Sequence, residues 1–98
     1  MNTANLQLEG VYAVLAALFG ALRDKGVCSD QEIEQLLAGV EKALASDPQR
    51  PTELRGANID AICFPARLLR HALQASSEGM DLSFAQLATR VGQTKPDH

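Results

Sequence analysis

The side chains that could carry out chemistry in this 98-residue chain are few and widely spaced. Cys63 and His71 are eight residues apart, which on a helix places them on different faces and two turns from each other. Metal sites use closely spaced Cys and His pairs, and the sequence has no Cys-x-x-Cys or His-x-x-x-His motif. We therefore expect no metal ligands and no cofactor.

Cys28 is the thiol best placed to be reactive, because it directly precedes the start of a predicted helix. The carboxylates of Asp30 and Glu32 oppose thiolate formation, and the sequence fixes no histidine beside it. Glu32 and Glu34 point to different faces of that helix, so they do not form an acid–base pair. With no glycine-rich phosphate loop either, the sequence predicts no catalytic residue and a protein that is not an enzyme.

A basic row in the second half of the chain is the best candidate for a binding surface. Arginine suits bidentate contacts with carboxylate or phosphate, so the row could bind a small anion or a protein partner, with help from Arg50 and Arg55. We favour a second interpretation, in which the row is a solvated or salt-bridged face whose arginines pair with acidic side chains of the 29–46 helix, in the same or a neighbouring subunit. The row follows the helical spacing i, i+3, i+4, i+7 and consists of Arg67, Arg70, His71 and Gln74.

The segment FAQLATRVGQTKPDH resembles the first helix and turn of a helix-turn-helix module. This resemblance implies a DNA-associated regulator that uses residues 83–98. Gln93 departs from the pattern, because an apolar residue usually follows the glycine, and the sequence stops at His98, before a recognition helix. The positions that match are a small residue in mid-helix, a glycine four residues later and two apolar neighbours: Ala88, Gly92, Leu87 and Val91.

The charge balance disfavours nucleic acid and anionic membranes as general partners. The net charge is −3, and the first 49 residues carry seven acidic and three basic side chains. The second half carries six basic and five acidic side chains, so a local positive surface remains possible there.

The N-terminal sequence, MNTANLQLEG, does not have the basic region of a signal peptide. The uncharged run from Gly10 to Leu22 is thirteen residues, whereas a bilayer span needs about 20. Two cysteines do not make a disulfide framework. We therefore expect a cytoplasmic, bacterial protein with no membrane contact.

The composition predicts an all-α fold, because Leu and Ala dominate the apolar residues and only 4% of residues are aromatic. We expect a single helical domain over residues 1–98, in which the first two helices form an antiparallel hairpin because only about four residues join them. A third helix kinked at Pro65 and a short fourth helix complete it. The helices are predicted at about 6–25, 29–46, 58–75 and 83–91, with a flexible tail at 93–98.

Local signals set the predicted helix ends. Asn5 is the expected N-cap of the first helix and Gly26 its C-terminal stop, while Asp47-Pro48 ends the second and Gly92 the fourth. Two capping boxes open the second and fourth helices: Ser29 with Glu32, and Ser83 with Gln86.

Pro65 leaves two alternatives for the third helix. The apolar period from Ile59 to Leu73 does not slip, which favours a continuous helix kinked where Pro65 leaves the carbonyl of Ala61 without a bond. Alternatively, Pro65 occupies the first position of a shorter helix that runs to about Ala75.

The first helix has two unlike apolar faces. Its large residues share one side and are expected in the core: Leu8, Val11, Tyr12, Leu15, Leu18, Phe19 and Leu22. The opposite side has only small residues, which let another backbone approach closely. These are the candidate dimer interface: Gly10, Ala13, Ala17, Gly20 and Ala21.

The small-residue side allows two interpretations. The helix could be the central helix of a monomer, covered on both sides, or it could form an isologous contact with a second copy. We favour the second, because few other helices are present to cover it. The sequence thus predicts a small non-enzymatic interaction or regulatory module acting as a homodimer, with the DNA-associated regulator as the alternative.

Overall fold

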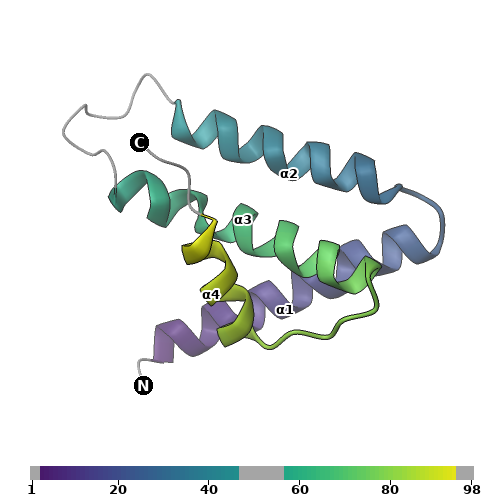
Figure 1. Cartoon of the computed structure of the whole chain (residues 1–98), viewed down its shortest axis with the longest axis horizontal. Coiled ribbons are helices and arrows are strands. Elements are labelled where there is room, and N and C mark those ends of the chain that lie inside the picture. The colour runs from purple at the N-terminus through teal and green to yellow at the C-terminus, as the bar shows by residue number, and fades with distance from the viewer. Residues whose placement is uncertain (1–2, 47–56, 95–98) are drawn as a thin grey trace.

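The structure is a computed structural model that describes residues 3–46 and 57–94 (Figure 1). These residues form four helices and no strand, which confirms the predicted all-α, four-helix fold. Arg50, Arg55, Asp47-Pro48 and the last four residues of the predicted tail lie outside the described residues. The helices are α1 (Thr3–Asp24), α2 (Asp30–Ala45), α3 (Ala57–Ser77) and α4 (Phe84–Gln93).

Both predicted capping boxes are confirmed. The Ser29 hydroxyl accepts a hydrogen bond from the Glu32 amide at 3.1 Å, and the Ser29 amide donates to Glu32 Oε1 at 2.9 Å. Ser83 and Gln86 make the same reciprocal pair at the start of α4. These bonds satisfy amide groups that a helix N-terminus leaves without partners, so they fix where α2 and α4 begin.

Glycines in the left-handed conformation end α1 and α3. Gly26 has φ 73° and Gly79 has φ 79°. After each, an amide returns to the carbonyl five residues earlier: Val27 to Leu22 at 2.9 Å, and Met80 to Ala75 at 2.8 Å. This is the hydrogen bond of a Schellman motif, and it confirms the predicted role of Gly26.

Two predicted helix ends are wrong. Asn5 is not an N-cap, because Thr3 and Ala4 are already helical. Gly92 does not end α4, since it has no positive φ. The helix continues to Gln93, and the Thr94 amide and hydroxyl both bond to the carbonyl of Arg90.

The centre of the fold is α3, which packs against each of the other three helices (Figure 1). α1 and α2 run in opposite directions through the short connection, but the most extensive contact between helices in the described part of the chain is between α2 and α3. Leu68 and Cys63 of α3 are the largest fully buried side chains among the described residues. α3 is also continuous through Pro65, as predicted.

Two apolar clusters hold the helices on α3. In the first, which we call the α2–α3 cluster, Ile33 and Leu37 of α2 pack with Leu69, and α1 adds Leu15 and Phe19. In the second, α4 packs on α3 beside Tyr12 of α1, through buried residues at three positions: Leu68, Leu87 and Val91.

α1 is held on one side only, and none of its described residues is buried. Tyr12, Leu15 and Phe19 are half-buried against the two clusters. Leu8, Val11 and Leu18, expected in the core, are exposed. The prediction for these three residues is wrong because α1 touches the body of the protein along a narrower strip than its apolar face.

Within the described residues, α1 is long and apolar enough to cross a membrane. The thirteen uncharged residues alone are too few to span a bilayer, whereas the whole helix has 22 residues. Signal sequences and central helices of soluble proteins share this length and composition, so the property does not assign a location.

Replacing a glycine by alanine should change the stability in opposite directions at a helix end and in mid-helix. Gly26→Ala should lower the free energy of unfolding by about 1–2 kcal/mol, because an L-residue is strained at positive φ. Gly39→Ala, in mid-helix with open space around a new Cβ, should raise it by up to about 1 kcal/mol. Urea denaturation of both variants measures the difference, and equal effects would contradict the assigned helix end.

Candidate functional site

The two arginines of the predicted basic row are bound by carboxylates of the same chain. Glu41 of α2 accepts from Arg67 Nε at 2.6 Å and from Arg70 Nη1 at 2.7 Å. Arg67 Nη1 also donates to Asp60 at 3.0 Å, and Arg70 Nε donates to Glu34 at 2.7 Å. We call these five residues the arginine–carboxylate cluster.

The centre of the arginine–carboxylate cluster is buried between α2 and α3. Arg67 is only 8% exposed, and Glu41 is nearly as buried. Burial alone would raise the pKa of Glu41, but hydrogen bonds and attraction from Arg67 and Arg70 outweigh it and hold that pKa below its ordinary value of 4.5. Glu41 is therefore ionised at neutral pH and is not placed to act as a general acid.

The cluster borders a small polar cavity of about 250 Å³ that brings together all four residues of the predicted row. His71 lies at its edge, where Nε2 is 3.0 Å from the hydroxyl of Thr94. The arginines thus pair with α2 of the same chain, which is the interpretation that the sequence favoured. An external anion would have to compete with Glu34 and Glu41 for them. The residues of the row in the cavity wall are Arg67, Arg70, His71 and Gln74.

His71 is held in its neutral form. Burial lowers its pKa below the ordinary value of 6.5, and the positive charges of Arg90 and Arg70 lower it further. The Glu34 carboxylate opposes these effects but does not outweigh them. Protonation of His71 therefore works against the folded state.

The cysteines do not join a reactive group in the described part of the chain. Cys28 is half-buried beside the α2–α3 cluster, and Cys63 is fully buried, with Sγ 3.5 Å from the carbonyl of Glu41. No group of three or more His, Cys, Asp or Glu side chains among residues 3–46 and 57–94 could hold a metal ion.

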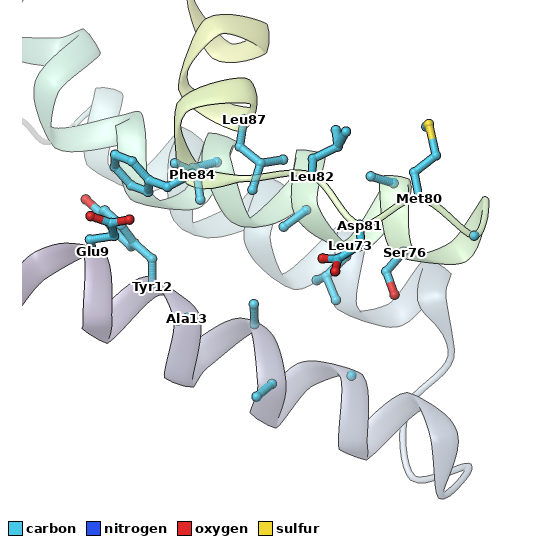
Figure 2. A pocket seen from close by; sticks show the side chains of 17 residues that line it. Glu9, Tyr12, Ala13, Leu73, Ser76, Met80, Asp81, Leu82, Phe84 and Leu87 are labelled. Atoms are coloured by element: carbon cyan, nitrogen blue, oxygen red, sulfur yellow. The ribbon is translucent and has the colours of Figure 1, made fainter.

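A larger groove lies between α1 and the segment that joins α3 to α4 (Figure 2). Its volume is about 610 Å³ and its lining is mostly apolar. Figure 2 shows Glu9, Tyr12 and Ala13 of α1 on one side, and Asp81, Leu82 and Phe84 on the other. We call this feature the α1 groove.

The aromatic side chains at the α1 groove anchor α1 to the rest of the chain. Tyr12 stacks on Phe84 with ring centroids 5.7 Å apart and an interplanar angle of 12°. Phe64 lies 6.0 Å from Tyr12. Burial raises the pKa of Tyr12 above its ordinary value of 10. Tyr12, whose position the sequence left open, is therefore part of the packing between α1, α3 and α4.

The predicted small-residue face of α1 is divided by the fold. Ala13, Ala17 and Gly20 line the α1 groove. Gly10 and Ala21 are exposed and do not line it. A Cβ at Gly10 would meet nothing within 4 Å, so no contact among the described residues accounts for this glycine.

Sequence reasoning missed the α1 groove, because part of its wall comes from the segment between two helices. Met80, Asp81 and Leu82 carry no periodic signal. The pairing of the arginines does have a signal in the sequence: Glu34 and Glu41 are seven residues apart, which places both carboxylates on one face of α2.

No protein-family model, curated protein or solved structure matches this chain.

Glu41 and Glu34 form a matched pair for testing the arginine–carboxylate cluster. Glu41→Gln should lower the free energy of unfolding by about 2 kcal/mol, because it removes the charge that serves two arginines in a buried place. Glu34→Gln should cost less than about 1 kcal/mol, because the Glu34 side chain is 46% exposed against 14% for Glu41. Denaturant titrations at pH 7 compare them, and similar costs would contradict the central role of Glu41.

The lowered pKa of His71 predicts a loss of stability in mild acid. The unfolded chain takes up a proton at the ordinary pKa of 6.5, whereas the folded chain resists it, so stability falls as the pH drops through 6.5. The loss is complete below the folded pKa. Thermal unfolding of His71→Gln between pH 7.5 and 5 should show a smaller decrease than the parent. Protonation of Glu41 causes a separate loss of stability, which begins only as the pH falls through 4.5.

Proposed function

We propose that this protein is a small non-enzymatic interaction module that acts as a homodimer through the outer face of α1. The observation that carries the proposal is the exposure of that face: Val14 is 67% exposed and Leu18 53% exposed. Such contiguous apolar surface is typical of interaction sites. We define the outer face by its exposed small and apolar residues that do not line the α1 groove: Gly10, Val11, Val14, Leu18 and Ala21.

A second copy is the partner that this face fits best. From Gly10 to Leu22 the helix has no charged side chain, so it offers nothing to complement a charged partner. An uncharged helix face can pair with its own copy about a two-fold axis. Gly10 and Ala21 let the two backbones approach closely there, which offsets the helix-weakening effect of the glycine.

Packing of α1 on the rest of the chain argues against a membrane-crossing role. A crossing helix meets lipid or other helices around its whole circumference. α1 instead gives one side to Phe64, Phe84 and the α2–α3 cluster, which leaves only the outer face for a partner. We propose, accordingly, that the protein is located in the cytoplasm.

The DNA-associated regulator has no specific support. Leu87 and Val91 of α4 are buried against α3. This leaves the resemblance at residues 84–98 as a match of pattern only.

Val14→Glu tests the proposed dimer without altering the α1 groove. The parent should have about twice the 10.5 kDa chain mass in light scattering, and dilution should shift it toward the monomer. The variant should weaken association at least about 100-fold, because the two-fold axis buries the new charge twice. Circular dichroism should show unchanged helix content.

Val27→Glu is the matched control. Val27 is 64% exposed, nearly as much as Val14, but it lies in the turn between α1 and α2. This variant should dimerise like the parent. A parent that stays monomeric at every concentration, or that is recovered only with membranes, would refute the proposed homodimer.

A further inference from the structure

We propose that the α1 groove is a binding site for an elongated apolar molecule that carries a protonated amine. This inference goes beyond the proposed dimer and does not depend on it, because the groove and the outer face use different sides of α1. It is drawn from the size of the groove, the nature of its lining and the sign of its charges.

The size and lining fit a small organic ligand. A volume of about 610 Å³ lies within the range of small-molecule pockets, which are mostly apolar with a few polar groups. The floor is formed by buried residues of α3 and α4, among them Leu68, Ala75 and Leu87. On the α1 side, Ala13 and Ala17 have short side chains that leave the space open. A hydrocarbon body can therefore lie along the groove.

The charges of the lining are negative. Glu9 lies beside Tyr12, and Asp81 points into the groove from the opposite side (Figure 2). Neither carboxylate has an ion pair within the described residues, whereas those of the arginine–carboxylate cluster are all engaged. No basic side chain lines the groove in this part of the chain. A cationic ligand is therefore the electrostatic complement of the α1 groove.

Arg23 does not reverse this preference. Its Nη2 donates to Ser76 at 3.1 Å, near the far end of the groove. The guanidinium is held by Asp24 at 3.3 Å and lies 3.7 Å from Asp30. An anionic ligand would have to meet Arg23 while its body passed Asp81, so an anion fits less well than an amine.

Tyr12 is a built-in reporter of the groove. It is the only tyrosine in the chain, and the chain has no tryptophan. Its ring lines the groove and stacks on Phe84, where it can also contact a bound ammonium group. Tyrosine fluorescence of the full chain therefore reports directly on occupancy.

Three probes of equal length and different charge test the inference: decylamine, decanol and decanoate, each titrated below its aggregation concentration at pH 7. Decylamine should change Tyr12 fluorescence and bind about tenfold tighter than decanol, because a charge-assisted contact is added to the same apolar burial. Decanoate should bind more weakly than decanol.

Variants locate the site. Glu9→Gln combined with Asp81→Asn should abolish the preference for the amine while retaining decanol binding. Glu78→Gln is the control for loss of a negative charge: this exposed residue does not line the groove and has no ion pair within the described residues, so the preference should persist. Ala13→Leu, which fills the groove, should weaken binding of all three probes, with helix content checked by circular dichroism.

Several results would overturn the inference. These are no response of Tyr12 to decylamine, tightest binding of decanoate, or an amine preference that survives in the Glu9→Gln/Asp81→Asn variant. Each of these results can occur whether or not Val14→Glu changes the mass in solution. The proposed ligand site and the proposed dimer can therefore be refuted independently.

Discussion

The bridge from Glu41 to Arg67 and Arg70 is the interaction on which the arrangement of this chain depends. One carboxylate on α2 engages two guanidinium groups on α3, in a place where an unmatched charge would be costly. It fixes the rotation of α2 against α3, and that rotation puts Ile33 and Leu37 onto Leu69. The tightest packing in the chain forms around this contact, so the fold is built on α2 and α3, and α1 lies against them.

The same bridge decides which surfaces remain for partners. Because Arg67 and Arg70 are engaged within the chain, the basic row adds little positive charge that a ligand could use. Glu9 and Asp81 line the α1 groove with no ion pair among the described residues, and the outer face of α1 has no charged side chain. The two proposals accordingly assign a cationic ligand to the groove and an uncharged surface to the outer face.

Local structure was predictable from sequence where a few neighbouring residues decide it. Ser29 with Glu32 and Gly26 act within one helical turn, and they lie where expected. The direction of α1 was not predictable in this way, because it is apolar around most of its circumference and its period does not say which side is covered. Leu18 and Phe19 are adjacent in sequence, yet one is exposed and the other packs on the α2–α3 cluster. The α1 groove was not predictable for the same reason, since Asp81 and Tyr12 line one groove only through the tertiary fold.

Weak attachment of α1 links the two proposed surfaces physically. With no buried residue of its own, α1 depends on partial contacts such as the stacking of Tyr12 on Phe84, and elements with few buried contacts open at low free-energy cost. A second copy bound to the outer face would hold α1 in place, and α1 is also one wall of the groove. A ligand in the groove would hold the same helix from its inner side. Each event would therefore reduce the ordering cost of the other, and by linkage the two would be positively coupled through α1. In the two proposals the uncharged run in the first helix would serve both surfaces, and a helix with a conventional polar outer side would support only one of them.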